Sequence, residues 1–582
     1  MKHSTFTSAA VFLSTSLSMP SYTRLSSDRM RSLPGFWKRW VRIGAVLLVG
    51  AVLFKGVGGF GGRAYAQGRV YNPVTDKIEL NHEFRGAWLT TVRGSDWPRK
   101  IKIEMKRKPG ESARDMKRRI EMQRDSQKQA LVDVITQIHN TGCNVVIMQL
   151  CCNSETYYRS SILPWDHNLT GVQGEDPGYD PLELAIKTAH SLGMEIHGWF
   201  NPMRIGGVDY NRVKDHLCYR KPERVITYGK VMYWNPGNPE VVQYLYDLIN
   251  EVMTNYDLDG AHIDDFFYPD GLRVKTEKIP ELKEQLDMEM NRQDGKPRDK
   301  QRIDAIKKEI KKLSDNKVWN DDAYFAKYGN GRTLGEWRES NVNALVAAMH
   351  RAVHDAKPNA VFGVSPGGRL VNTQRLYADP QHWIEEGSID YLAPQIYWQH
   401  GHQIADFKQV LDSWEPIMKE VPTLPGLAAY RFKEKGFESM EEFGLQVKEC
   451  REAGFVYGNI WFTTHSLFKP EFMTYLMTEI YPYRSLTPTL GTSTYPAPNA
   501  PVVSEHSGTL RWDDVQGAQQ YAVYELELKK DAQRMLGDVW KANMVALTKQ
   551  CKFKKTTKGK NYLVVAVRGK MRSNASNVVF VK

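Results

Sequence analysis

The chain has 582 residues, of which 41% are hydrophobic and 25% are charged. This composition excludes a disordered or fibrous protein, and the length predicts one large domain with at least one smaller domain. The formal net charge is +12, but residues 1–66 contain nine Lys or Arg and one Asp, which leaves +4 for the rest. A nucleic-acid partner is therefore not expected, because the basic surplus lies mostly in one terminal segment.

Residues 1–66 are predicted to be a signal peptide or an N-terminal anchor. A basic stretch, Lys38–Arg42, precedes an apolar run over 43–54, and Ala64-Tyr65-Ala66 follows. A run of this length is short for a membrane span of about 20 residues and is typical of a signal-peptide core. We therefore expect export to the periplasm, the cell envelope or the medium. An uncleaved anchor is the alternative, and it would be the protein's contact with a membrane.

Apolar runs of strand length alternate with helical patterns between residues 80 and 482. The expected strands cover 84–90, 144–150, 194–200, 260–266, 361–366, 391–398, 423–430 and 456–464. Eight β–α units predict a parallel sheet closed into a (β/α)₈ barrel. An open doubly wound sheet is the alternative, but no Gly-rich phosphate loop follows the first strand. Charged segments at 99–125 and 275–317 are predicted to be surface insertions, the second of them helical.

The sequence changes character after residue 482. Residues 483–498 form a linker rich in Pro, Thr and Ser, and residues 499–582 contain short alternating strands without helices. With Trp512 early and Tyr521 central, this pattern resembles a fibronectin type III or immunoglobulin-like β-sandwich. The six cysteines have no metal-ligand spacing and are predicted to be mostly buried free thiols.

Strand four, "GAHIDDF", is predicted to present a carboxylate at the barrel mouth. Catalytic groups in such barrels lie at the C-terminal ends of the strands, and side chains alternate along a strand. Ala261 and Ile263 are apolar and should face the helices, so His262 and Asp264 should face the lumen. The same alternation turns Asp265 away, toward the loop and neighbouring backbone.

The other strand ends supply amides, aromatics and one arginine. Strand three points Glu195, His197, Trp199 and Asn201 inward and is followed by Arg204. Further inward-facing residues are expected on strands two, six and eight: Gln149, Cys151 and Asn153; Gln395 and Tyr397, with Trp398 beside them; and Asn459, Trp461 and Thr463. Aromatic faces stack on sugar rings, and amides and carboxylates bind hydroxyl groups, so this rim indicates a glycan substrate. We expect no cofactor and no metal, because the inward histidines form no ligand set.

Several motifs, in order, resemble the bacterial glycosyl hydrolase-like family ten. They are "FRGAWLTTVRGSDWP", "GYDPLELAIKTAHSLGMEIHGWFNPMR", "NPGNPEVVQYL", "YDLDGAHIDDFFYP", "YGNGRTLGEWRESNVNALV", "FGVSPGGR" and "DYLAPQIYW". The resemblance implies an exported glycoside hydrolase with a barrel similar to those of α-amylases, and one relative is understood to cut peptide-free peptidoglycan strands. By position it places the aspartate pair on Asp264 and Asp265, the "DWP" acid on Asp96 and the strand-six amide on Gln395. Cys151-Cys152 departs from the family pattern.

We therefore expect a glycosidase that acts on a polysaccharide, with peptidoglycan-type strands favoured. Asp264 is the expected nucleophile or base, and Glu155 or Asp96 is its expected acid partner. The expected substrate-binding residues are Asp265, Trp97, Tyr158, Trp199, Asn201, Arg204, Tyr268, Gln395, Tyr397, Trp398 and Trp461. Three alternatives remain: nucleophilic assistance by a substrate acetamide, a non-catalytic glycan-binding scaffold, and a metal-dependent deacetylase. The sequence predicts neither the anomeric outcome nor the oligomeric state.

Overall fold

The structure is a computed structural model that describes residues 78–80, 82–291, 299–314, 318–418, 421–527 and 540–582. The predicted signal peptide or anchor over 1–66 lies outside the described residues. In the part that the structure describes, no helix combines the length and apolarity that crossing a membrane requires.

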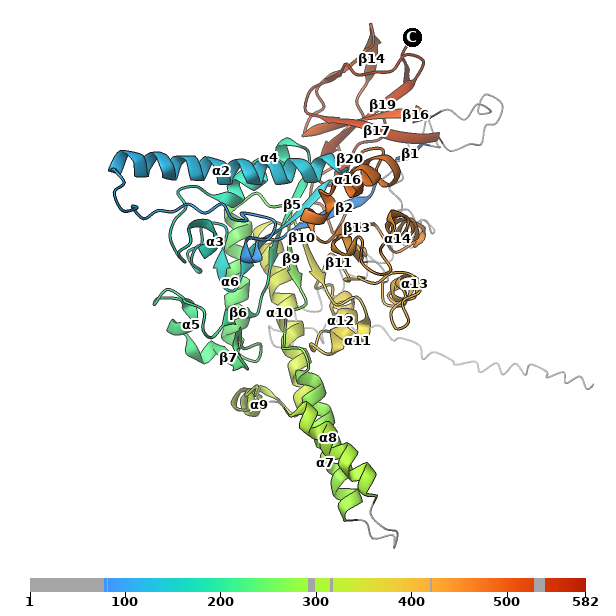
Figure 1. The fold of residues 1–582 in the computed structure, drawn as a ribbon. Helices are drawn as coiled ribbons and strands as arrows, with labels where there is room; N and C mark the ends of the chain where they lie inside the picture. The colour runs from blue at the N-terminus through green and yellow to red at the C-terminus, as the bar shows by residue number, and fades with distance from the viewer. Residues whose placement is uncertain (1–77, 81, 292–298, 315–317, 419–420, 528–539) are drawn as a thin grey trace, which may run out of the picture. The chain divides into compact units, whose positions relative to one another are not determined.

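Parallel strands form the main sheet, as the sequence predicts (Figure 1). In chain order they are β2 (Phe84–Leu89), β3 (Val145–Cys152), β5 (Glu195–Phe200), β9 (Gly260–Asp264), β10 (Val361–Ser365), β11 (Tyr391–Leu392), β12 (Gly426–Leu427) and β13 (Gly458–Trp461). Neighbours in the chain pair in the sheet, and β13 pairs with β2. Parallel bridges from Leu392 to Thr423 and from Gln395 to Gly426 join β11 to β12, which closes the ring. The result is a (β/α)₈ barrel.

Helices connect the strands and cover the outside of the barrel. The long ones are α2 (Ala113–Asn140), α4 (Pro181–Ser191), α6 (Pro239–Asn255), α10 (Leu334–Ala356) and α14 (Met440–Glu452). Local capping sets where these helices begin. Asp180 and Asn238 accept backbone hydrogen bonds at the starts of α4 and α6, where Pro is the first residue, and Thr333 forms a capping box with Glu336 at the start of α10.

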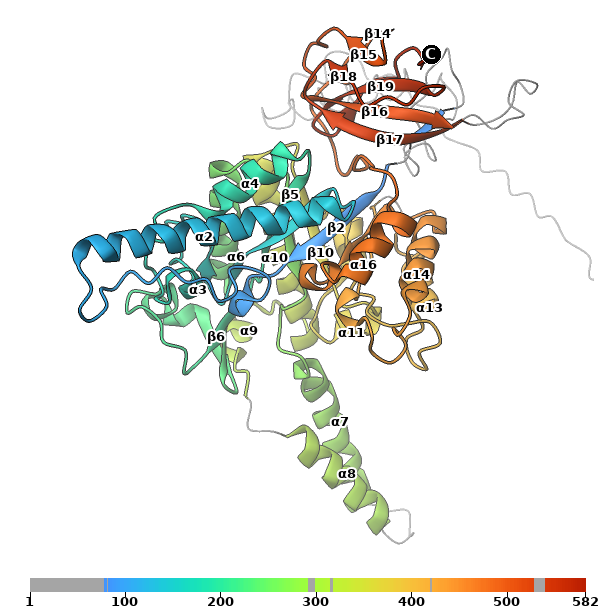
Figure 2. The same cartoon turned by 45° about the horizontal axis from the view of Figure 1, so that its top comes forward.

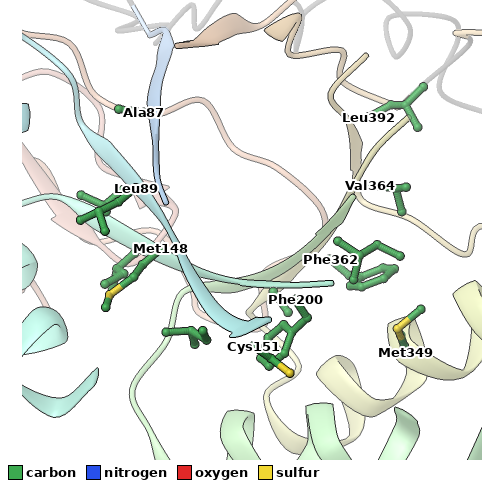
Figure 3. Close-up of a cluster of buried hydrophobic side chains, with 14 of the residues drawn as sticks. Ala87, Leu89, Met148, Cys151, Phe200, Met349, Phe362, Val364 and Leu392 are labelled. Carbon is green, nitrogen blue, oxygen red and sulfur yellow. The ribbon is translucent and has the colours of Figure 1, made fainter. Parts of the chain in front are cut away.

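Alternation along the strands divides the core into two layers. Side chains between strands and helices form the larger layer, and Figure 3 shows Ala87, Leu89, Phe362, Val364 and Leu392 on that side of the strands. A smaller set fills the lumen: Phe84, Trp88, Val145, Ile147, Trp199, Val361, Tyr391, Ala393, Leu424, Ile460 and Leu490. The lumen is thus packed, and only its C-terminal mouth remains for binding.

Two insertions follow strands at that mouth (Figure 2). After β5, the strands β6 (Arg204–Gly207), β7 (Val225–Tyr228) and β8 (Val231–Trp234) form a small antiparallel sheet. After β9, α7 (Leu272–Met290) and α8 (Lys300–Leu313) run side by side, which confirms a helical second insertion, and α9 (Asp322–Tyr328) leads back to the barrel.

The C-terminal residues form two small sheets. One contains β14 (Val503–His506), β15 (Thr509–Trp512) and β18 (Lys552–Phe553), and the other contains β16 (Gln520–Glu527), β17 (Trp540–Thr548), β19 (Asn561–Arg568), β20 (Met571–Arg572) and β21 (Val579–Phe580). Strand β1 (Ile78–Leu80) joins the second sheet by parallel pairing with β17, which the sequence did not predict. A fibronectin type III or immunoglobulin-like identity stays a prediction.

Candidate active site

Asp264 is the last residue of β9 and is 5% exposed at the C-terminal end of the strand. Ala261 and Ile263 pack in the outer layer, so Asp264 and His262 are on the lumen side, as the alternation predicts. One carboxyl oxygen, Oδ2, accepts a hydrogen bond from Asn201 Nδ2. The other, Oδ1, has no hydrogen-bond partner among the described residues. A buried carboxyl oxygen without a partner is costly, so this atom is the place where a substrate group would be accommodated.

A chain of amides orients Asn201 toward Asp264. The backbone N–H groups of Thr91 and Val92 donate to Gln149 Oε1 over 2.9 and 2.8 Å. Gln149 Nε2 then donates to Asn201 Oδ1 over 2.6 Å, which leaves the Asn201 amide nitrogen to donate to Asp264. Because each amide can donate only from nitrogen, the direction of the whole chain is set by the two backbone donors. Strands β2, β3, β5 and β9 thereby position one carboxyl group.

Burial changes the protonation of the aspartate pair. It raises the pKa of Asp264 well above its ordinary value, and the charge of Asp265 adds to this effect while Arg204 opposes it. Burial also raises the pKa of Asp265 to about 6. The Phe266 backbone N–H and the Trp199 indole N–H also lower the pKa of Asp264, but neither forms a hydrogen bond with its Oδ1. Burial and the neighbouring carboxylate therefore both favour the protonated form of Asp264.

Strand alternation predicted that Asp265 turns away from the mouth, but in the structure it faces the mouth. Its Oδ1 accepts a hydrogen bond of 3.4 Å from Gln395 Nε2, and Gln395 also donates to the Ser365 carbonyl. Asp265 follows the last residue of β9, so the alternation of the strand no longer sets its direction. Both carboxyl groups are consequently on the same side of the barrel.

The aspartate pair should make stability fall as pH rises. Between about pH 4 and pH 6 the unfolded chain has released its proton from Asp265, whose pKa there is near 3.8, while the folded chain still binds one. Stability therefore decreases with pH across this window. One pKa unit corresponds to about 1.4 kcal/mol, so the free energy of unfolding should fall by about 2 kcal/mol across this window after allowance for solvent. Asp265→Asn should abolish this fall, because asparagine does not titrate. Urea unfolding at half-unit pH steps measures this, with exposed Asp287→Asn as the matched control; parallel profiles for wild type and Asp265→Asn would contradict it.

Arg204 begins β6 and is half-buried beside the aspartate pair. Its guanidinium carbon lies 4.0 Å from the centre of the Phe266 ring, which is 40% exposed. Its charge acts on both Asp264 and Asp265, but neither is within ion-pair distance of it among the described residues. The ring fixes the guanidinium plane, so its N–H groups are available to an acidic ligand.

Aromatic side chains form the other side of the mouth. Tyr397 stacks on Phe462 with ring centres 5.7 Å apart and planes 14° apart, and Tyr430 packs edge-on against both. The charges of Asp264 and Asp265 both reach Tyr397, so this stack borders the acidic pair. Trp398 is half-buried next to Tyr397. Partly exposed aromatic rings beside carboxylates are a typical surface for a sugar.

Four aromatic residues predicted to bind substrate are buried in the protein interior instead. Trp97, Tyr158, Tyr268 and Trp461 are each at most 1% exposed and belong to the layer between strands and helices. Trp97 donates to the Gln127 carbonyl and Trp461 to the Tyr481 hydroxyl, each over 3.0 Å. For Trp97 and Trp461, the burial of a large aromatic surface with its indole N–H satisfied outweighs exposure at a strand end. On β13 the lumen-facing residue is Ile460, so the alternation predicted for that strand was wrong.

Asp96, one of the two predicted acids, forms hydrogen bonds to two segments of the chain, at Thr90 and at His465. Its Oδ2 accepts from the Thr90 backbone and hydroxyl over 2.9 and 2.7 Å, and its Oδ1 accepts from the His465 backbone over 3.1 Å. It is 4% exposed. With both oxygens accepting hydrogen bonds, this carboxylate is suited to holding the end of β2 against α15 (Thr464–Leu467), which follows β13.

Glu155, the other predicted acid, is fully buried in a polar cluster with Asp166, His167 and Tyr210. His167 Nδ1 donates to it over 2.8 Å and the Tyr210 hydroxyl over 2.7 Å, and Gln173 also donates. Burial alone would raise the pKa of Glu155, but the hydrogen bonds from His167 and Tyr210 outweigh it and keep the pKa below its ordinary value. An ionised carboxylate with these donors is poorly suited to give a proton to a substrate.

A β-bulge sets the directions in which the side chains of Cys151 and Cys152 point. The register between β3 and β5 shifts between Gln149 and Cys151, so Cys151 lies in the outer layer beside Phe200 (Figure 3). The prediction that Cys151 faces the lumen was therefore wrong. The charge of Asp264 acts instead on Cys152, whose pKa burial raises to about 12. All six cysteines are free thiols, and five of them are buried.

The structure thus brings together Trp199, Asn201, Arg204, Asp264, Asp265, Gln395 and Tyr397 at one end of the barrel. Two carboxyl groups with raised pKa values beside ring faces and an arginine can perform proton transfer on a bound sugar. The sequence contained no signal for the contribution of Phe462, because its position depends on the facing of β13.

Curated relatives are glycosyl hydrolases. The chain is 29% identical to glycosyl hydrolase YngK of Bacillus subtilis over 497 residues, which cover 79% of this chain and 86% of YngK. It is 27% identical to glycosyl hydrolase DigH of Escherichia coli over 391 residues, which cover 62% of this chain and 76% of DigH.

Solved structures similar to this chain include the PgaB (BpsB) glycoside hydrolase domain from Bordetella bronchiseptica. It has a TM-score of 0.38 and 12% identity, covering 60% of this chain and 93% of that domain. The fold assignment is based on the strand order above. The sequence model of the family described as glycosyl hydrolase-like 10 matches residues 83–439, more than half of the chain. The protein therefore belongs to the glycosyl hydrolase-like 10 family and is a glycoside hydrolase.

Proposed function

We propose that this glycoside hydrolase cleaves glycosidic bonds within peptidoglycan-type glycan strands outside the cytoplasm. The observation that carries the site assignment is the buried Oδ1 of Asp264 at the barrel mouth, which has no hydrogen-bond partner among the described residues and lies near Asp265 and Arg204. The family assignment supports glycoside hydrolysis. The basic, apolar and small-residue pattern of residues 1–66 supports export.

Asp264 is proposed as the general acid. Because Oδ2 accepts a hydrogen bond from Asn201, the proton of the carboxyl group resides on Oδ1, which has no acceptor among the described residues. That proton can pass to the glycosidic oxygen as the bond to the leaving sugar breaks. The sequence suggested the nucleophile or base for Asp264, but its raised pKa favours the protonated form and hence the acid role.

Asp265 is proposed as the carboxylate partner. Its pKa of about 6 leaves it ionised at neutral pH, whereas burial favours the protonated form of Asp264. An ionised carboxylate beside the sugar can stabilise the positive charge that develops at the anomeric carbon, activate water, or position a substrate acetamide that serves as the nucleophile. Gln395, which donates to Asp265, would hold it in place.

Product analysis by mass spectrometry tests the substrate. The protein is incubated with peptide-free peptidoglycan strands, chitin oligosaccharides and α-glucans, with Asp264→Asn in parallel. We expect fragments from peptidoglycan strands alone and none with the variant. Cleavage of chitin or α-glucan in preference would replace the proposed substrate, and binding without cleavage of any glycan would favour a scaffold role.

Arg204 should select for a sugar that carries a carboxylate. Peptide-free peptidoglycan carries a free lactyl carboxylate on every second sugar, and an accessible guanidinium fits such a group. We expect Arg204→Met to raise KM on peptidoglycan strands about tenfold or more, with little change on chitin oligosaccharides, which lack the carboxylate. Steady-state kinetics on both glycans measures this. Exposed Arg351→Met is the control, and an equal loss on the two glycans would contradict a selective role.

A further inference from the structure

Two histidines and an aspartate meet at the N-terminal end of the barrel strands, opposite Asp264. His350 and His354 are one turn apart on α10, and Asp390 immediately precedes β11. One ligand atom from each of the three side chains lies within 4.8 Å of the other two. All three residues are partly exposed, so the cluster is accessible to solvent.

Part of this cluster repeats a structural connection found elsewhere in the barrel. His354 Nε2 donates to Asp390 Oδ2 over 2.9 Å, and the same oxygen accepts from the Phe362 backbone over 2.7 Å. One pair of strands earlier, His190 Nε2 donates to Asp259 Oδ2 over 2.9 Å, and that oxygen accepts from the Ile196 backbone over 2.8 Å. In both places a histidine near a helix end is joined to the aspartate that precedes the next strand.

His350 distinguishes the His354–Asp390 connection from the His190–Asp259 connection. Its ring lies 4.4 Å from that of His354, and its Nε2 is 3.9 Å from Asp390 Oδ2 without a hydrogen bond. Ligand atoms around a tetrahedral zinc ion are about 3.3 Å apart. The separations from Asp390 Oδ2 of 2.9 Å for His354 and 3.9 Å for His350 bracket this value. Histidines four residues apart on a helix commonly bind zinc through their Nε2 atoms.

The charges of the cluster suit a cation. Asp390 supplies a carboxylate oxygen, and His350 and His354 supply imidazole nitrogens, which together are a donor set that zinc-type ions accept. Lys570 and Arg351 oppose a cation, while Asp390 is the anionic ligand.

We propose that His350, His354 and Asp390 bind a divalent transition-metal ion of the zinc type. Two imidazoles and one carboxylate supply three ligands, and solvent completes the coordination because the side chains are partly exposed. The site is at the end of the barrel away from Asp264, so the ion stabilises the packing of α10 against β11 and takes no part in glycan cleavage.

Equilibrium dialysis of the full chain against Zn²⁺, after removal of metal by a chelator, tests the proposal. We expect one ion per chain, and an affinity at least about tenfold lower in His350→Asn. Co²⁺ should give the intense visible absorption of a four-coordinate site in the wild type but not in the variant. Zn²⁺ should also raise the Tm by a few degrees, because only the folded chain has the assembled ligands.

His190→Asn is the matched control, because it breaks the equivalent connection that has no additional histidine. It should bind Zn²⁺ as the wild type does. Zinc binding that is equal in the wild type and in His350→Asn/His354→Asn would overturn the proposal, as would no binding at micromolar Zn²⁺. Binding that is lost only in His167→Asn would instead place the ion at Glu155 and Asp166. Because glycan cleavage is assayed separately, neither result depends on the proposed substrate.

Discussion

Asp264→Asn should lower kcat/KM on peptidoglycan strands by about 10³-fold or more while the fold is retained. A positioned general acid typically contributes 10²- to 10⁴-fold, and asparagine has nearly the same shape but no proton to transfer. The fold should persist because burial and the neighbouring Asp265 favour the protonated form of Asp264, so a neutral side chain of the same shape is tolerated there. Steady-state kinetics and circular dichroism measure the two effects.

The leaving group of the substrate distinguishes the acid role from the other catalytic roles. An aryl glycoside whose phenol is acidic needs little protonation, so Asp264→Asn should cleave it at nearly the wild-type rate if Asp264 is the acid. The same substrate should remain poor for Asp265→Asn, because loss of the carboxylate impairs the anomeric centre whatever the leaving group. Equal losses on both substrates for Asp264→Asn would assign it the nucleophile or base role. Glu155→Gln is the comparison, and a 10³-fold loss on peptidoglycan strands there would make Glu155 the acid.

Asp321→Ala should lower the free energy of unfolding of the barrel by about 3–5 kcal/mol. Arg338 and Asp321 form two hydrogen bonds, of 2.9 and 2.7 Å, and their side chains are 2% and 0% exposed. Removal of the carboxylate leaves a buried guanidinium without its counter-charge, which is far more costly than the loss of an exposed pair. Urea unfolding followed by tryptophan fluorescence measures the change.

Two further variants make this measurement specific. Asp412→Ala removes the exposed partner of Lys408 and should change stability by less than about 1 kcal/mol. Arg338→Met combined with Asp321→Ala should recover part of the loss, because no unpaired charge then remains. If Asp321→Ala and Asp412→Ala have equal effects, the buried Arg338–Asp321 pair contributes no more to stability than an exposed pair.

Much of the barrel could be predicted because each strand is a short apolar run and each helix has local start signals. The helix at Leu334–Ala356 begins at a capping box formed by Thr333 and Glu336, a signal that depends only on neighbouring residues. Asp264 was placed at the mouth for a similar reason. Its apolar neighbours, Ala261 and Ile263, identify the outer face of β9 without reference to any other strand.

The predicted direction of a side chain was wrong where a distant group or a β-bulge sets that direction. Trp461 is turned outward with its indole on the Tyr481 hydroxyl, and Cys151 is turned outward by a register shift against β5. Neither effect leaves a local signal, because a polar partner outside the barrel and a bulge are properties of the packed sheet. The same limit applies to Glu155, whose pKa depends on His167 and Tyr210 brought to it by two different loops.

The eight-unit barrel, the family and the strand-four aspartates could be predicted from the sequence alone, because apolar periodicity and ordered motifs are local properties of the chain. Only the folded structure shows which carboxyl oxygen is buried with no partner among the described residues, which aromatic rings line the mouth, and that His350, His354 and Asp390 lie together. It also decided the pairing of β1 with β17. Burial, hydrogen-bond partners and distances between segments far apart in the chain exist only once the chain is folded, and they set the chemistry of the site.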